Sequence, residues 1–162
     1  MPVTRDIAAT YRGPGAVMRR LLAAGPREDR ALAILMGACL LVFIAQWPAI
    51  SRRAHLEELE LNALLAGALF GWLFIAPLGL YLLAALSHLV AKLFGGKGGW
   101  YGARLALFWS LLASTPLILL NGLVAGFIGK GAALSIIGLA WFGVFLWFWL
   151  SSLKVAEQGD RA

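Results

Sequence analysis

The sequence predicts an all-α transmembrane bundle of four spans, preceded by a short amphipathic interfacial helix. Two observations support this fold class. The 162-residue chain is 61% apolar and only 14% charged, whereas a soluble domain carries about 25% charged residues. Its apolar residues also gather into runs of about 20 residues or more, which is the length a helix needs to cross a bilayer core of about 30 Å.

Residues 1–30 form the first segment, which we expect to be cytoplasmic or interfacial. Pro14 suits the first turn of a helix, and Gly25-Pro26 ends that helix. Arginines border an apolar stripe on one side of this helix. The stripe consists of Val17, Met18, Leu21 and Leu22. Such a stripe is typical of a helix that lies in the membrane interface. A cytoplasmic helix packed under the bundle is the alternative.

The bundle itself is predicted to cover residues 31–153. Its four apolar runs are residues 31–50, 63–91, 105–128 and 132–153. None of them contains Lys, Arg, Asp or Glu, so they are apolar on all sides, unlike an amphipathic helix of a soluble protein. Pro77 predicts a kink in the second run and Pro116 one in the third. If the third run instead breaks between Pro116 and Gly122, the bundle has five spans.

The distribution of basic residues predicts the orientation of the chain. Eleven Lys and Arg lie before the first run, around the second loop or in the tail 154–162, and three lie in the first and third loops. Cytoplasmic loops of membrane proteins carry an excess of these residues. We therefore expect a multi-pass protein of the cell inner membrane, with the N-terminus, the second loop and the C-terminal tail on the cytoplasmic side.

The second loop, with the sequence FGGKGGWYG, invites comparison with phosphate-binding loops. A P-loop would need Gly at Ala91 and Ser or Thr after Lys97, and a dinucleotide fingerprint would need Gly at Tyr101. Neither pattern is present. We predict a tight turn between two spans, in which Lys92, Lys97 and Arg104 contact lipid headgroups.

Few polar residues lie inside the predicted spans. Ser110, Ser114 and Asn121 share one face of the third run, and Gln46 of the first run lies at a depth similar to that of Asn121. We hypothesise a hydrogen bond between Gln46 and Asn121 in the bundle interior. Alternatively, the stripe Ser110, Ser114 and Asn121 lines a substrate path in a small transporter or channel component.

Small residues at helical spacing indicate where two helices can approach closely. Gly67 and Gly71 form such a pair in the second run, and Gly122 and Gly126 form another in the third. Each pair could serve packing inside one chain or contact with a second copy.

The sequence contains no recognisable catalytic set. No span carries a carboxylate, and no nucleophile has a histidine at usable spacing. The two histidines, His55 and His88, are expected at opposite ends of the bundle and cannot share a metal ion. We therefore predict a non-enzymatic protein without cofactor or metal. The net charge of +6 suits anionic lipid, and no nucleic-acid-binding module is recognisable.

The stretch from 93 to 120 resembles the signature of the Yip1 family. The matching positions are a glycine-rich loop and a proline near the middle of the next helix: Gly95, Gly96, Lys97, Gly98 and Pro116. The resemblance covers about 31–153, and the opening segment is similar to that of short bacterial members. Five spans are usual in the family, which would move the tail across the membrane.

This resemblance implies a role but not a reaction. Eukaryotic members are associated with Rab GTPases and vesicle traffic, whereas the composition of this chain indicates a bacterium. We expect a membrane organiser or an accessory or scaffold protein, with membrane lipids as partners and a homo-oligomer or larger membrane complex as a further possibility. The alternatives are a small transporter or channel component, or a subunit of a larger membrane complex.

Overall fold

The structure, a computed structural model, describes residues 3–158, which contain helices and no strand. The elements are α1 (Val3–Thr10), α2 (Pro14–Ala23), α3 (Glu28–Leu56), α4 (Leu61–Phe70), the π-helix η1 (Gly71–Ile75), α5 (Ala76–Leu93), α6 (Trp100–Ala113), α7 (Thr115–Phe127) and α8 (Ala132–Glu157). The predicted all-α bundle is confirmed. The helix α1 was not predicted.

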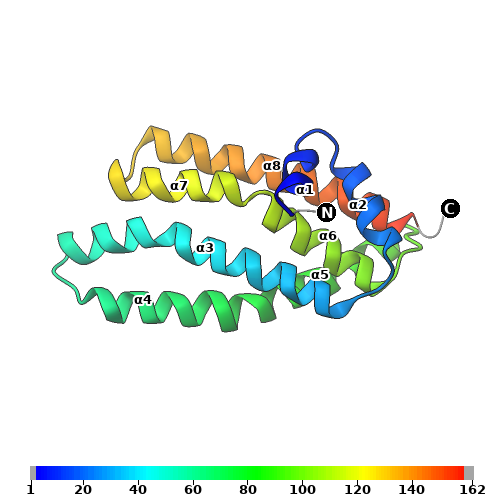
Figure 1. The fold of residues 1–162 in the computed structure, drawn as a ribbon, viewed down its shortest axis with the longest axis horizontal. Coiled ribbons are helices and arrows are strands. Elements are labelled where there is room, and N and C mark those ends of the chain that lie inside the picture. The colour runs from blue at the N-terminus through cyan, green and yellow to red at the C-terminus, as the bar shows by residue number, and fades with distance from the viewer. Residues whose placement is uncertain (1–2, 159–162) are drawn as a thin grey trace.

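The long helices lie side by side along one axis (Figure 1). One end of the bundle carries α2, the start of α3, the loop between α5 and α6, and the end of α8; we call it the loop end. The other end carries the turns that join α3 to α4 and α7 to α8 (Figure 1). Three helices are long and apolar enough to cross a membrane, namely α3, the continuous Leu61–Leu93 and α8. A fourth span is present if the bent pair of α6 and α7 counts as one.

The third apolar run is bent by 44° but does not turn back. In Figure 1, α6 starts at the loop end and α7 continues to the other end. The five-span alternative is therefore not what the structure shows. The break also lies earlier than predicted, at Ser114 rather than between Pro116 and Gly122, because the proline ring starts a new helix at its first turn instead of kinking one in the middle.

Pro116 has no N–H, so the carbonyl of Leu112 one turn earlier loses its usual helical donor. The hydroxyl of Thr115 donates to that oxygen instead, at 2.6 Å. The amide of Leu117 donates to the carbonyl of Ser114 rather than to that of Ala113 one turn earlier. The carbonyl of Ala113 therefore also lacks its helical donor. Backbone groups left unpaired in lipid cost several kcal/mol, so both freed oxygens need a donor.

The second freed carbonyl is bonded by the N-terminal segment. The hydroxyl of Tyr11, between α1 and α2, donates to the oxygen of Ala113 at 2.8 Å. Burial raises the pKa of Tyr11, so this hydroxyl remains a donor. Beside it, the indole N–H of Trp109 donates to the hydroxyl of Thr10 at 3.1 Å, and Arg20 pairs with Asp6 to join α2 to α1. The segment before the first span is thus part of the bundle.

The apolar stripe of α2 faces protein. Val17, Met18 and Leu21 are buried in the main core, where α2 packs against α8. Of the two alternatives for this amphipathic helix, the structure favours packing on the bundle. The helices α1, α3, α5 and α8 surround α6, in which 11 of 14 residues are buried.

The second and fourth long helices present their apolar side chains outward. No residue of α4 is buried, and on α5 and α8 Leu78 and Leu139 are 73% and 72% exposed. Because water penalises such a surface, these faces require lipid or another membrane protein around them.

The two glycine pairs have different surroundings. A Cβ on Gly122 would lie 2.8 Å from the carbonyl carbon of Ala45, and one on Gly126 would lie 2.8 Å from that of Pro48. This pair therefore lets α7 pack directly on the backbone of α3. A Cβ on Gly67 or Gly71 would meet nothing within 4 Å, so this pair makes no comparable close backbone contact within residues 3–158.

Replacing Tyr11 with Phe is expected to destabilise the protein by about 1 to 3 kcal/mol, because the buried carbonyl of Ala113 loses its donor. Thermal unfolding in detergent measures the effect. Tyr101→Phe is the matched control, since the buried hydroxyl of Tyr101 has no hydrogen-bond partner among residues 3–158. Equal melting temperatures for the two variants would contradict the assigned role of Tyr11.

Candidate functional site: the glycine loop and the end of α8

The loop of residues 94–99, here the glycine loop, begins as a helix cap. The amide of Gly96 donates to the carbonyl of Ala91 at 2.8 Å, and that of Gly95 donates to Lys92 at 3.0 Å. This pair of hydrogen bonds is the Schellman motif, which requires a residue in the left-handed conformation just after the helix. Gly95 supplies it, with φ of 86°. The cap ends α5 and turns the chain toward α8.

The glycine loop then binds the last turn of α8. The amide of Lys97 donates to the carbonyl oxygen of Glu157 at 2.8 Å. The amide of Gly98 donates to the carboxylate of the same residue, Oε2, at 3.3 Å. Two consecutive amides of the loop are therefore held by one residue, which fixes the loop to the end of the last helix.

Close approach explains why Gly96 and Gly98 are glycine. A Cβ on Gly96 would lie 2.6 Å from Oε2 of Glu157, and one on Gly98 would lie 2.9 Å from the carbonyl carbon of Ala156. By contrast, a Cβ on Gly99 would meet nothing within 4 Å. The sequence predicted a tight turn between two spans. The structure adds that the loop is also a docking surface for α8.

A buried pair lies directly beneath the loop. Nδ1 of His88, on α5, is 2.7 Å from Oε1 of Glu157, and both side chains are buried. The imidazole also packs against Trp100, with 4.4 Å between ring centroids. Nε2 of His88 is buried and has no hydrogen-bond partner within residues 3–158. Glu157 thus joins three parts of the chain: α5, the glycine loop and α8.

Sequence reasoning missed this pair. It weighed His88 only as a metal ligand and placed Glu157 in a cytoplasmic tail, whereas α8 continues to that residue. The two residues are 69 positions apart, so no local pattern connects them. The available signal was topological, because the predicted four-span layout puts the second loop and the tail at the same end.

The three basic residues predicted to contact lipid headgroups lie in different settings. Lys92 Nζ is 5.7 Å from the centroid of the Trp100 ring, a cation–π distance, and Lys97 is exposed on the loop. Arg104 forms an ion pair with Glu28 at the start of α3, so its charge is already matched inside the chain. The structure leaves Lys92 and Lys97 exposed and pairs Arg104 with α3.

Several polar residues of the spans donate to backbone carbonyls. Ser110 donates to Ala106 at 2.6 Å and Ser114 to Leu111 at 2.9 Å, each within its own helix. The predicted bond between Gln46 and Asn121 is wrong. Although both line one cavity, the side-chain amide of Asn121 donates instead to the backbone carbonyl of Leu134 on α8, at 3.3 Å.

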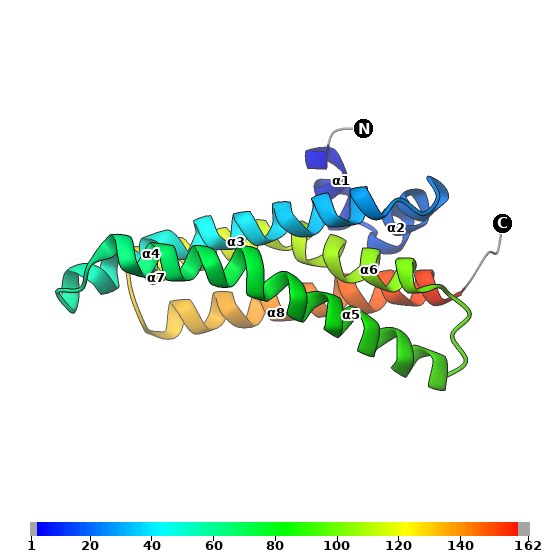
Figure 2. The same cartoon turned by 90° about the horizontal axis from the view of Figure 1, so that it is seen from below.

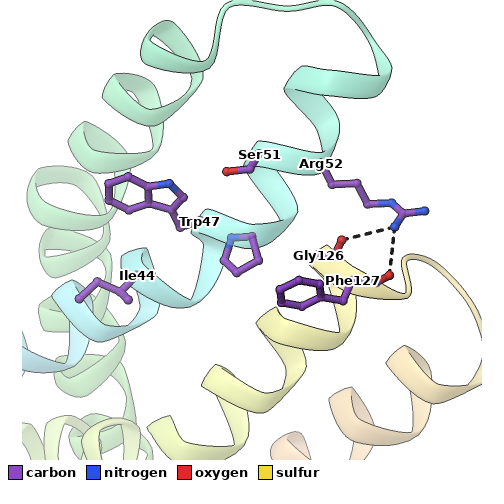
Figure 3. Close-up of a pocket in the computed structure, with 7 residues that line it drawn as sticks. Ile44, Trp47, Ser51, Arg52, Gly126 and Phe127 are labelled. Carbon is purple, nitrogen blue, oxygen red and sulfur yellow. Dashed lines mark hydrogen bonds between the residues drawn. The ribbon is translucent and has the colours of Figure 1, made fainter.

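At the opposite end of the bundle, an apolar pocket lies between α3 and α7 (Figure 3). Ile44, Trp47 and Phe127 form part of its lining. Arg52 donates to the carbonyls of Gly126 and Phe127 at 3.3 and 3.5 Å, as Figure 3 shows. Its guanidinium therefore caps the C-terminal end of α7, where a positive charge interacts favourably with the helix dipole.

Comparison with known proteins identifies the family. A family model described as the Yip1 domain matches residues 8–160. The chain belongs to the Yip1 family. No curated protein and no solved structure matches it. The Yip1 match covers nearly the whole chain, from α1 to the end of α8, and so includes the glycine loop and Pro116.

Family membership and the apolar helices together show a multi-pass membrane protein. In this Yip1 protein, Gly95, Gly96 and Gly98 have distinct physical tasks: the first takes a left-handed conformation, and the other two allow contact with Glu157 and Ala156. The contact fixes the loop end of the bundle. The proposed function depends on the side chains that are exposed at this end of the bundle.

Proposed function

We propose that this Yip1-family protein is a non-enzymatic membrane organiser that gathers anionic lipids around its glycine loop. The observation that carries the proposal is the surface at the end of α5. Leu93 and Phe94 are 85% and 86% exposed, and Lys92 and Lys97 stand on either side of them in the sequence. Two outward apolar side chains between two cations are suited to a membrane interface.

Each component of this surface contributes to lipid binding. The side chains of Leu93 and Phe94 gain free energy when they leave water for the acyl region. A Lys near an anionic leaflet contributes about 1 kcal/mol. Because Glu157 holds the loop through two amides, little conformational entropy is lost when lipid binds.

The proposed orientation places this surface in the cytoplasmic leaflet of the inner membrane. In the sequence, eleven Lys and Arg lie before the first span, around the second loop or in the tail, against three in the first and third loops. Figure 1 supports this grouping, since α2, the start of α3, the glycine loop and the end of α8 lie together. The positive-inside bias assigns that end to the cytoplasm.

Native mass spectrometry in nanodiscs tests the proposal. The double variant Lys92→Gln/Lys97→Gln is expected to retain about 30-fold less phosphatidylglycerol than the wild type, since two charges of about 1 kcal/mol each are lost. Lys130→Gln is the matched control, because that exposed lysine lies in the turn at the opposite end. Phe94→Ser should reduce retention of anionic and zwitterionic lipid alike.

Two results would overturn the proposed function. One is retention of phosphatidylglycerol that does not change in the double variant, or that falls equally in Lys130→Gln. The other is a fixed stoichiometry with further polypeptides after gentle extraction, which would make the chain an accessory subunit of a larger complex.

A further inference from the structure

The bundle contains a cavity of about 630 Å³ between its spans. Residues from α3, η1, α5, α6, α7 and α8 line it: Val42, Gln46, Trp72, Ala76, Gly79, Leu80, Leu83, Leu111, Ile118, Asn121, Gly138 and Trp141. Its volume lies within the range of small-molecule sites, about 300 to 1,000 Å³. None of the glycine-loop residues is part of this lining, so the cavity is separate from the surface proposed to bind headgroups.

Two interruptions in the helices shape this cavity. On one side, the π-helix η1 lies next to Pro77, and Figure 2 shows that α5 departs there from the direction of α4. On the other side, the third span is bent by 44°. A π-helical turn inside an α-helix is frequently associated with a functional site. Here it brings Trp72 into the wall of the cavity.

The cavity lies where α5 and α8 do not pack closely. α5 packs against α3 and α6, whereas α8 packs against α6 and α7. The lining on these two helices includes Gly79 and Gly138, and a Cβ on Gly79 would meet no atom within 4 Å. The outer faces of α5 and α8 are exposed and apolar, so bilayer lipid is expected next to both helices.

The polar groups of the lining define what the cavity can bind. The side chain of Gln46 makes no hydrogen bond within residues 3–158, while the indole of Trp141 and the amide of Asn121 are engaged with Ser114 and Leu134. An amide left in apolar surroundings without a partner is costly, and a ligand oxygen would satisfy it. No residue in the lining is charged, which disfavours an ionised headgroup.

We propose that this cavity binds an uncharged chain lipid carrying a hydroxyl or carbonyl oxygen, which accepts a hydrogen bond from Gln46. The apolar walls take the hydrocarbon chain, and the amide selects for the oxygen. A long-chain alcohol, an isoprenoid quinone and a diacylglycerol share this chemistry, and the mass of a co-purified molecule distinguishes them. The site does not depend on the proposed role of the glycine loop.

Photolabelling of the full chain in nanodiscs tests the proposal, with hexadecanol bearing a mid-chain diazirine as the probe. We expect the label on Trp72, Leu80 and Leu83, and competition by unlabelled hexadecanol. Gly79→Leu fills the cavity and should reduce this labelling at least tenfold. Gly67→Leu is the matched control, because Gly67 also has no neighbour within 4 Å but lies outside the cavity.

A second variant tests the role of the amide without filling the space. In the wild type, hexadecane should compete about tenfold less well than hexadecanol, which corresponds to one hydrogen bond of about 1.4 kcal/mol. In Gln46→Leu, the two competitors should become equal. This comparison is made within one variant, so a modest change in its stability does not affect the result.

Two results would overturn the inference. One is labelling spread evenly over outward residues such as Leu78 and Leu139 and unchanged in Gly79→Leu, which would mean ordinary contact with surrounding lipid. The other is persistent discrimination between hexadecanol and hexadecane in Gln46→Leu. Lys92→Gln/Lys97→Gln should leave cavity labelling intact, so the failure of one proposal is distinguishable from the failure of the other.

Discussion

Replacing Gly122 with Ala is expected to lower the free energy of unfolding by about 3 kcal/mol, the upper part of the range for overpacking a filled interior. The added Cβ would overlap the carbonyl oxygen of Ala45 and lie 2.8 Å from the carbonyl carbon. These are backbone atoms in the middle of α3, which cannot rotate away as a side chain can. Relief therefore requires α3 and α7, an extensively packed helix pair, to move apart.

Thermal unfolding in detergent measures this effect, and a loss of about 3 kcal/mol corresponds to a shift of roughly 10 °C for a chain of this size. Gly67→Ala makes the same chemical change where a Cβ would meet nothing within 4 Å. Because Ala is the better helix former, the control should match or slightly exceed the wild type. If both variants melt together, the packing assigned to Gly122 is wrong.

Replacing Gly98 with Ala is expected to release the glycine loop from α8. The new methyl group would overlap the carbonyl oxygen of Ala156 and lie 3.0 Å from Cα of Glu157. The loop can move as a unit, so the expected result is local opening rather than global unfolding. Once the loop lifts, the amides of Lys97 and Gly98 lose their acceptors on Glu157.

Hydrogen exchange is the appropriate measurement, since it reports local opening directly. A local loss of about 2 kcal/mol would accelerate exchange at the amides of Lys97 and Gly98 about 30-fold. In Gly99→Ala, where a Cβ meets no neighbour within 4 Å, exchange should stay near the wild-type rate. Acceleration of equal size in both variants would argue against docking through Gly98.

Local information was sufficient to predict most of the architecture. The long helices follow from apolar runs, and α2 from Pro14, Gly25 and the stripe between them. In contrast, α1 has only eight residues and is held by tertiary contacts such as Trp109 to Thr10. Short helices of this kind have no stability of their own, so the pattern of their residues carries little signal.

The polar contacts were harder to predict than the helices. Equal depth in the membrane suggested a hydrogen bond between Gln46 and Asn121. Depth does not determine, however, the direction in which a side chain points around its helix. Asn121 points toward α8 and bonds to Leu134. The same limit applies to His88 and Glu157, whose contact depends on how the ends of α5 and α8 come together.

The bond between Tyr11 and Ala113 also affects how the protein is made. Its partners are 102 positions apart, which at ribosomal speed separates their synthesis by roughly 5 to 20 seconds. Docking of α2 must come later still, because α2 packs on α8, which follows the other described helices in the sequence. The helices α1 and α2 therefore dock only after the helices they contact have been made, and their resistance to a protease would report that α8 is in place.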